Sequence, residues 1–341
     1  MKTRRYEPPA APAPQKTPDE TAEPAKVRQV AVDERGVGQR LDNFLGRILT
    51  GVPKSLIFRV IRKGEVRVNG KRAKPESRLQ AGDMVRVPPV RTGASAPPRR
   101  IPDTLVSGIT GAIVREDAQL LVIDKPAGVA VHGGSGVSFG IIEALRAARP
   151  NEDLELVHRL DRDTSGLLLV ARKASALRTL HALLRDGQVE KRYLALVKGK
   201  WELGQKRIDV PLRTDIRVGG ERHVKAHASG KDAVSLFKPV QFFGKRASLV
   251  EVTLETGRTH QIRVHATHAG YPLAGDEKYG EAEFNENMKA AGLTRMFLHA
   301  HQLGFVWPES GVEFTASAPL PADLKQVIDA LQESAVRKRR S

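Results

Sequence analysis

The sequence predicts an α+β protein in which a small basic α/β module precedes a larger domain built on an antiparallel or mixed sheet. Three observations support this prediction. Residues 51–100 contain 13 Lys or Arg and 3 Asp or Glu, so they hold +10 of the chain's net charge of +17. Residues 89–104 are rich in Pro, Gly, Ser and Arg, as a linker is. Residues 105–335 mix strand-like and helical runs without a regular βαβ alternation.

The composition excludes several classes of protein. The 341 residues contain no cysteine, which rules out a disulfide scaffold, a cysteine zinc site, a thiol nucleophile and an iron–sulfur cluster. No apolar run reaches the roughly 18 residues that span a bilayer, and the N-terminus lacks the apolar core of a signal peptide. We therefore expect a soluble, cytoplasmic protein that binds a polyanion and no membrane.

Both ends of the chain have biased compositions. Residues 1–27 repeat Pro and Ala without an apolar period, which predicts a disordered tail. A mitochondrial presequence is the alternative, and four acidic residues in this stretch disfavour it. Residues 336–341 form a short basic tail of the kind that is usually solvated.

The basic stretch has a regular pattern of its own. Apolar residues at helical spacing predict a helix that Gly64 ends: Leu56, Ile57, Val60 and Ile61. Residues 65–68 alternate as a strand does, the pair Asn69-Gly70 favours a hairpin turn, and residues 83–87 predict a second strand. An earlier helix starts at Arg40. Two short helices and a small sheet would form a compact module over residues 38–88.

Residues 38–88 resemble an S4 RNA-binding domain. The resemblance rests on Gln39-Arg40-Leu41-Asp42 at the start and on the helix–strand core from Ile61 to Gly70. It implies that the cations of the module face RNA phosphates, which agrees with the charge count: Arg40, Lys54, Arg59, Arg62, Lys63, Lys71 and Arg72. Charge alone leaves open the alternative of a solvated basic linker.

The larger domain, residues 105–335, contains candidate strands and helices in irregular order. The strand-like patterns cover residues 119–123, 166–171, 193–197 and 247–254. The helical patterns cover residues 140–148, 174–184, 259–268 and 322–331. Many strands with a few irregular helices are typical of an α+β domain.

Two polar segments of this domain adjoin apolar strands. Residues 158–166 lie between two apolar runs and predict a tight polar loop between buried strands, although a solvent-exposed turn is the simpler interpretation of this segment alone. Thr259 is the expected N-cap of the helix over 259–268, which places Arg263 between the apolar Ile262 and Val264. A half-buried arginine needs a carboxylate, and a half-buried carboxylate needs a cation.

Other common catalytic motifs are incomplete. The glycine-rich residues 132–136 lack both the Lys-Ser/Thr ending of a P-loop and the final glycine of a nucleophile elbow. His260, His265 and His268 lack the HExxH spacing of a zinc site, so packing, solvent or RNA contact explains them better. The sequence therefore predicts neither a metal nor a cofactor.

Residues 105–335 resemble the catalytic domain of the RluA/RluC/RluD family of pseudouridine synthases. His158-Arg159-Leu160-Asp161-x-x-Thr164-Ser165-Gly166 matches the family signature, and residues 124–128, 191–193 and 257–263 match further motifs. Residues 51–55 and 132–140 are similar to the RluC branch, which acts on 23S ribosomal RNA. The resemblance implies that specific uridines of that RNA are isomerised to pseudouridine. Reactant and product are isomers, so no cofactor is required.

The resemblance also implies roles for individual residues. Asp161 would be the catalytic carboxylate, Arg263 its salt-bridging arginine, and Tyr193 the ring that packs against the flipped base and can take part in proton transfer at C5. Asp161 would either attack C1′ or abstract a ribose proton, and both routes need the same ionised group. Arg159 would contact an RNA phosphate or brace its loop, whereas Asp163 would be structural.

Two other functions stay open from the residues. A non-catalytic S4-type factor for ribosome assembly would bind RNA with a strong salt dependence and modify nothing. An N-glycosylase that uses the carboxylate would release free uracil. The expected partner is RNA rather than DNA, and nothing in the sequence requires more than a monomer.

Overall fold

The computed structural model describes residues 27–34, 36–49, 52–90, 100–134, 137–216 and 222–340, and the side chains of residues 54, 216, 222 and 335–340 fall outside that description. The expected tail other than Val27, the linker residues 91–99 and the side chains of the basic C-terminal tail therefore lie outside the described residues. The chain divides into two compact units, an N-terminal unit (Met1–Pro98) and a C-terminal unit (Arg99–Ser341).

The N-terminal unit combines a four-stranded antiparallel sheet, in the order β1-β4-β2-β3, with two helices. Its elements are β1 (Arg28–Ala31), α1 (Leu41–Ile48), α2 (Lys54–Lys63), β2 (Arg67–Val68), β3 (Lys71–Arg72) and β4 (Met84–Val87). Apolar side chains of both helices form a core of their own with the sheet. The structure confirms the two predicted helices. It adds β1, which lies ahead of the expected module and pairs with β4.

The turns of this unit follow the predicted glycine signals. Gly64 takes the left-handed conformation, with φ of 75°, at the C-cap of α2. Asn69 and Gly70 both have positive φ, 50° and 76°, and join β2 to β3. Two consecutive residues of this conformation match the twist of the flanking strands, which explains why Asn-Gly is favoured there.

The C-terminal unit is organised around a ten-stranded mixed sheet in the order β10-β13-β14-β9-β15-β8-β6-β5, with β16 beside β15 and β7 beside β8. Only the pairing of β15 with β8 is parallel among those that join these strands. The strands are β5 (Ile113–Glu116), β6 (Leu120–Lys125), β7 (Glu155–Leu156), β8 (Ser165–Ala171), β9 (Glu190–Lys198), β10 (Lys206–Asp209), β13 (Val234–Phe243), β14 (Ala247–Leu254), β15 (Leu298–Val306) and β16 (Glu313–Ser317).

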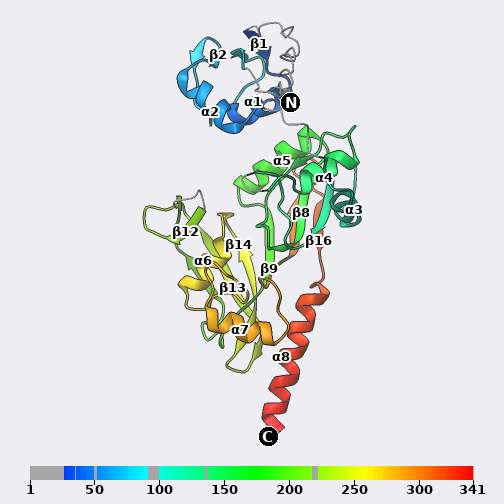
Figure 1. The fold of residues 1–341 in the computed structure, drawn as a ribbon, viewed down its shortest axis with the longest axis vertical. Helices are drawn as coiled ribbons and strands as arrows, with labels where there is room; N and C mark the ends of the chain where they lie inside the picture. Colours follow the sequence, from blue (N-terminus) through cyan, green and yellow to red (C-terminus); the bar gives the residue numbers. More distant parts are fainter. Residues whose placement is uncertain are drawn as a thin grey trace, which may run out of the picture. The chain divides into compact units, whose positions relative to one another are not determined.

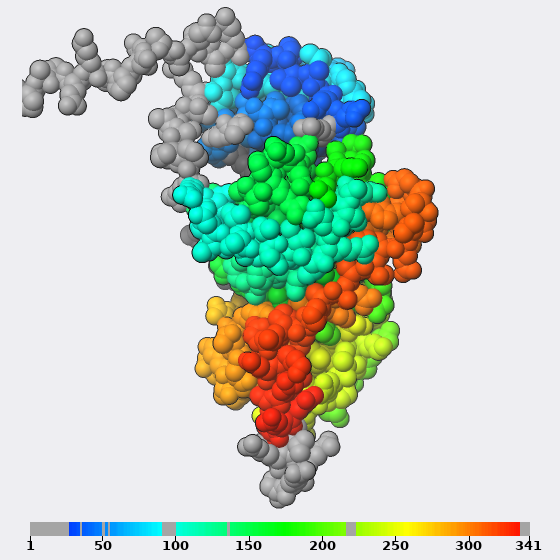
Figure 2. Space-filling model, turned by 90° about the vertical axis from the view of Figure 1, so that its right-hand side faces the viewer, coloured from blue at the N-terminus to red at the C-terminus, as the bar shows by residue number. Residues whose placement is uncertain are grey.

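Helices cover both faces of this sheet. The helices are α3 (Asp103–Gly111), α4 (Ile141–Ala148), α5 (Ala174–Arg185), α6 (Gln261–His268), α7 (Ala282–Ala290) and α8 (Ala322–Arg340). Side chains of α3, α4 and α6 share one core with the sheet, whereas α5 packs in a second core and α7 with α8 in a third. Figure 1 shows α4 and α5 near β8, and α6 and α7 near β13 and β14. In Figure 2, α8 (red) runs along the surface beside α7 (orange).

A separate antiparallel pair, β11 (Leu212–Ile216) and β12 (Arg222–Ala226), lies against α6. Leu212 and Val224 form a small apolar cluster with Val264 of α6. The pair therefore covers the helix that carries Arg263. None of the described helices is long and apolar enough to cross a membrane.

Candidate active site

A cavity of about 520 Å³ in the C-terminal unit contains all three residues for which the family motifs implied a catalytic role. Asp161 comes from the loop between β7 and β8, Tyr193 from β9, and Arg263 from α6. These segments are separated by up to 102 residues in the sequence. Their convergence supports the interpretation of residues 158–166 as an ordered loop beside buried strands.

The loop of Asp161 is fixed at its end by a close backbone approach. Gly166, at the start of β8, lies between β6 and β15, where it pairs with Lys125 and Ala300. Its φ is +106°, and a Cβ atom there would lie 2.2 Å from the carbonyl oxygen of Ala300. Only glycine fits without a shift of the backbone, so the last residue of the signature is a structural requirement for placing the loop.

Buried Lys125 stabilises the same loop through hydrogen bonds to backbone carbonyl oxygens. Its Nζ donates hydrogen bonds of 2.8 Å to the carbonyl oxygens of Pro126 and Arg162. Burial lowers the pKa of Lys125 to about 7, although the carboxylates of Asp163 and Asp161 oppose this shift. A neutral amine still has two hydrogens for these two carbonyls. Lys125 can therefore brace the residue that follows Asp161 in either protonation state.

Arg263 bridges two carboxylates. Its Nη1 donates to Asp161 Oδ2 at 3.3 Å, while Nε and Nη2 donate to the two oxygens of Asp276 at 2.7 and 2.8 Å. The fork–fork contact with Asp276 sets the plane of the guanidinium and aims the remaining nitrogen at Asp161. Although burial works against the charged form, the two carboxylates raise the pKa of Arg263 above its usual value. The cation therefore stays charged beside Asp161.

Asp276 was missed by the sequence reasoning. Its side chain is 1% exposed, against 20% for Asp161. Burial favours its neutral form, but Arg263 and the backbone N–H groups of Lys278 and Tyr279 hold the pKa of Asp276 below its usual range. Arg263 was the one signal in the sequence that could have predicted this second carboxylate. A planar guanidinium can bind one carboxylate with two of its nitrogens and still donate to another carboxylate with the third.

Tyr193 forms part of the cavity wall. Its side chain belongs to the buried core that also contains Ile262 and Leu298, and its residue is 7% exposed. Burial and the nearby negative charge of Asp161 raise the pKa of the Tyr193 phenol above its usual range. The hydroxyl is therefore protonated at neutral pH, and the mostly buried side chain lines the cavity.

His260 lines the cavity, and Tyr279 contacts both His260 and Arg263. The Tyr279 hydroxyl accepts from the backbone N–H of Val224 at 3.0 Å and lies 2.8 Å from His260 Nδ1, while its ring stacks under the Arg263 guanidinium at 4.9 Å. His260 Nε2 lies 3.9 Å from Asp161 Oδ2. Burial lowers the pKa of His260, so the imidazole favours its neutral form. Arg263 is then the main positive charge at Asp161.

The prediction of an N-cap at Thr259 is wrong. The helix begins at Gln261, and the residue at its N-cap is His260 in the left-handed conformation with φ of 53°. The Gln261 side chain instead accepts from the backbone N–H of Arg258 and from the Thr256 hydroxyl. These contacts tighten the turn before the helix, and the left-handed His260 directs its ring toward Asp161.

Comparison with known proteins identifies the family. A sequence profile described as RNA pseudouridylate synthase matches residues 119–268, and one described as S4 domain matches residues 39–85. The chain is 50% identical over 309 residues to the ribosomal large subunit pseudouridine synthase C of Pasteurella multocida, covering 90% of this chain and 94% of that protein. The chain belongs to the RNA pseudouridine synthase family. The resemblance that the motifs carried is thereby confirmed.

Further relatives of this pseudouridine synthase agree. The ribosomal large subunit pseudouridine synthase C of Escherichia coli K12 is 49% identical over 316 residues, which cover 92% of this chain and 99% of that protein. The solved structure of human RNA pseudouridylate synthase domain containing 4 is similar with a TM-score of 0.56 and 25% identity, covering 67% of this chain and 96% of that one. The fold class predicted for the chain is confirmed together with its enzyme class.

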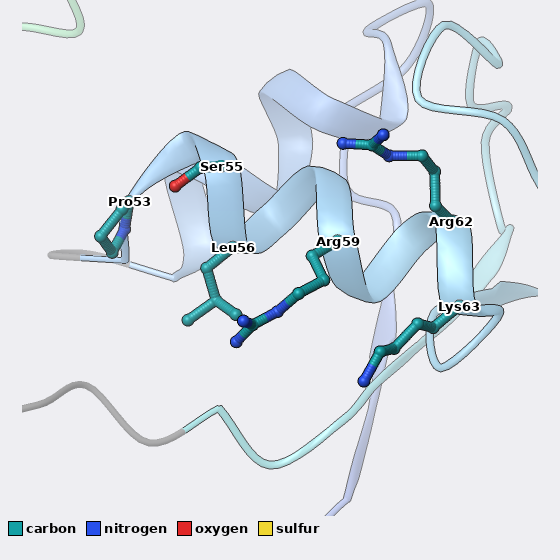
Figure 3. Close-up of a pocket in the computed structure, with 6 residues that line it drawn as sticks. All are labelled: Pro53, Ser55, Leu56, Arg59, Arg62 and Lys63. Carbon is teal, nitrogen blue, oxygen red and sulfur yellow. The ribbon is translucent and has the colours of Figure 1, made fainter.

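The predicted RNA contacts of the N-terminal unit lie in different environments. Six residues of α2 and its start line a groove of about 690 Å³: Pro53, Ser55, Leu56, Arg59, Arg62 and Lys63. Figure 3 shows Leu56, Arg59 and Lys63 projecting from one side of α2 and Arg62 from the other. Arg59, Arg62 and Lys63 all line this groove, and their contact with RNA stays a prediction. The Lys54 side chain lies outside the described residues.

The remaining predicted contacts are less uniform. Arg40 forms a fork with Asp42, at 3.0 and 2.7 Å, so its charge is already paired. Lys71 and Arg72 are exposed on β3, and Arg72 donates to the carbonyl oxygen of Lys63 at 3.2 Å.

Arg159 is exposed and lines the cavity of Asp161 in the C-terminal unit. Arg159 therefore belongs with the catalytic unit rather than with the S4 surface.

The cavity is suited to a charged group held in a partly dry environment. Within the described part of the chain, no three His, Asp or Glu side chains come together as a metal site would require. What the cavity does offer is one carboxylate with an arginine partner, a tyrosine ring and an apolar floor.

Proposed function

We propose that the chain converts specific uridines of 23S ribosomal RNA to pseudouridine, with Asp161 as the catalytic carboxylate. The observation that carries this assignment is the contact of Asp161 with Arg263 in the same cavity as Tyr193. The large-subunit substrate is supported by the names of the relatives that match nine-tenths of the chain. A ribosomal substrate also favours action in the cytoplasm and on RNA rather than DNA.

The target uridine must leave its base stack to reach Asp161. Eversion of a base costs a few kcal/mol. Stacking on an aromatic ring such as Tyr193 returns about 1–3 kcal/mol, and phosphate contacts from the basic surface around Arg59 contribute further. The cavity can then hold the everted base against Tyr193, with the ribose at Asp161.

Asp161 acts in its ionised form in both routes that the chemistry allows. It either attacks C1′ of the ribose or removes a ribose proton, and in both the bond between C1′ and N1 of uracil breaks. The detached base turns and C5 bonds to C1′. In the first route the bond between Asp161 and C1′ breaks as this bond forms, and in the second Asp161 returns the proton to the ribose. The proton on C5 is then lost and N1 gains one. Arg263 donates a hydrogen bond to the carboxylate and orients it throughout.

Tyr193 is assigned to holding the base. Burial keeps its phenol protonated, so a phenolate is not available at neutral pH to accept the proton from C5. The flat ring can contact the uracil both before and after the base turns. A residue that binds by stacking tolerates this rotation, because stacking does not depend on a fixed hydrogen-bond pattern.

The test is a map of pseudouridine in 23S ribosomal RNA from cells with and without this chain. We expect particular sites to remain uridine when the chain is absent and to be restored by the wild-type gene. An unchanged map would contradict the proposal, and RNA binding without modification would support an assembly factor instead. Release of free uracil from RNA incubated with the purified chain would indicate an N-glycosylase.

A further inference from the structure

Lys191 is a buried cation in the wall of the Asp161 cavity. The residue is 9% exposed, one of few charged residues buried in the described part of the chain. It lies two positions before Tyr193 on β9, and both line the cavity. Since side chains alternate along a strand, Lys191 and Tyr193 project from the same face of β9. The proposed reaction gives no role to this lysine.

Among the described residues, Lys191 has no ion-pair partner, in contrast to its neighbour Arg192. Arg192, on the opposite face of β9, forms an ion pair with Glu190 at 2.6 Å and approaches Glu251 at 3.9 Å. No hydrogen bond or ion pair joins the Lys191 ammonium to any of the described residues. Burial lowers the pKa of Lys191. Its Nζ is not one of the fully buried polar atoms without a partner, so the ammonium reaches the open space of the cavity, where an anionic ligand can meet it.

We propose that Lys191 binds a phosphate oxygen of the RNA backbone at the everted uridine. This inference rests on the proposed function, since it places the target nucleotide in the cavity. A phosphodiester is the permanent anion of RNA, and the compact lysine ammonium suits it as a point charge.

The spacing along β9 favours the backbone over the base as the ligand. Tyr193 is assigned to the uracil ring and Asp161 to the ribose. Two residues of a strand span about 7 Å, so Lys191 lies roughly one nucleotide's width from the ring of Tyr193. Arg159, also in the cavity wall, is exposed and can meet phosphates farther out. Lys191 would thus bind the phosphate next to the everted uridine that lies farthest inside the Asp161 cavity.

The test compares Lys191→Met with a matched control, Lys238→Met. Methionine keeps the length of the buried side chain and removes its charge, while Lys238 is an exposed lysine on β13 outside the cavity. The probe is a short fragment of 23S ribosomal RNA around a uridine that the map in cells with and without this chain assigns to it. We expect Lys191→Met to raise Kd and KM about ten-fold or more with kcat within two-fold. The slope of log Kd against log salt should fall by about 0.7, and Lys238→Met should change neither.

Stability separates this role from a structural one. Replacing an unpaired buried charge by an apolar group of similar shape should leave Tm unchanged or raise it. A lower Tm for Lys191→Met together with unchanged RNA affinity would overturn the proposal and make Lys191 a structural residue.

A neutral methylphosphonate placed at each phosphate next to the target uridine identifies the contact. We expect one such substitution to weaken binding by the wild-type enzyme and to have no further effect on Lys191→Met. If Kd is unchanged and only kcat falls, the ammonium serves the base instead and the proposal is overturned. A wild-type chain that modifies no uridine in the fragment refutes the proposed function separately, because the binding measurements do not require turnover.

Discussion

Arginine side chains in the two units of this chain have opposite environments. Arg59 of the N-terminal unit is exposed in a groove and has no acidic partner among the described residues. Arg263 of the C-terminal unit is 11% exposed at its side chain and contacts two carboxylates. An exposed arginine interacts with phosphates through a screened, salt-dependent attraction. A buried and paired arginine instead fixes the position and charge of another side chain.

This contrast separates affinity from catalysis. Removing an exposed cation should alter how strongly RNA binds and how salt affects binding. Removing a buried one should alter the rate of the chemical step and the stability of the fold, because its partners are left buried without a counter-charge.

The largest effect is expected from Arg263→Met. We expect kcat for pseudouridine formation to fall by at least about a hundred-fold, because Asp161 loses the hydrogen-bonded cation that orients it. The free energy of unfolding should fall by about 3–5 kcal/mol, since Asp276 stays buried without its partner. Nucleoside chromatography and denaturant unfolding measure the two effects.

Two further variants sharpen that result. Arg263→Lys keeps a charge but loses the fork, and it should recover stability better than rate. Asp276→Asn keeps the shape while weakening the contact that orients Arg263, and it should lower kcat while leaving RNA affinity unchanged. A fully active Arg263→Met would show that Asp161 does not depend on this ion pair.

The next effect concerns the tyrosine. Tyr193→Leu should lower kcat/KM by roughly ten- to a hundred-fold, the equivalent of about 1–3 kcal/mol of stacking. Tyr193→Phe keeps the ring and should lose much less, because the buried hydroxyl is assigned no proton transfer. Steady-state kinetics on a defined RNA fragment compare the two variants. Equal losses in both would mean that the hydroxyl, and not the ring, is the functional group.

A pH-dependent effect is expected from Lys125. Because burial lowers its pKa to about 7, the unfolded chain binds more protons than the folded chain between about pH 7 and the usual lysine range. The free energy of unfolding should therefore rise with pH through this window, by at most about 1.4 kcal/mol per pH unit. Lys125→Met lacks this contribution, so the stability difference, wild type minus variant, should increase from pH 7 to 9. A difference that is flat with pH would contradict the lowered pKa.

The smallest effect is expected at the exposed groove. Arg59→Ala should weaken RNA binding by a few-fold, lower the slope of log Kd against log salt by about 0.7–0.9 and leave kcat unchanged. Arg40→Ala is the matched control, because Arg40 already pairs with Asp42 and should change the slope less. A loss of kcat in Arg59→Ala would remove the distinction between the two units.

Several elements of the fold and the site could be predicted from the sequence, because local residue patterns determine them. The helical period of residues 56–61 and the Asn69-Gly70 turn specify their elements without help from distant residues. The polar residues 158–166 between apolar runs indicated a loop. The family motifs predicted that Tyr193 and Arg263 act together with Asp161 of this loop, and the structure places all three in one cavity.

The rest depends on tertiary packing. Asp276 lies 13 residues beyond Arg263 in a segment with no regular period, and its buried carboxylate is stabilised by the guanidinium together with two backbone N–H groups. Thr259 is a good cap in isolation, but the Gln261 side chain satisfies the turn and moves the helix start. Strand β1 is four residues long and is stabilised by pairing with β4, more than fifty residues away.

The most direct test of the catalytic role of Asp161 is the activity of Asp161→Asn on 23S ribosomal RNA, measured by nucleoside chromatography alongside the Kd for the same RNA. Asparagine keeps the size of the side chain and removes its negative charge. We expect pseudouridine to fall at least about a thousand-fold, with Kd within a few-fold of wild type. A variant that still forms pseudouridine at the wild-type rate would show that the carboxylate beside Arg263 does not perform the reaction.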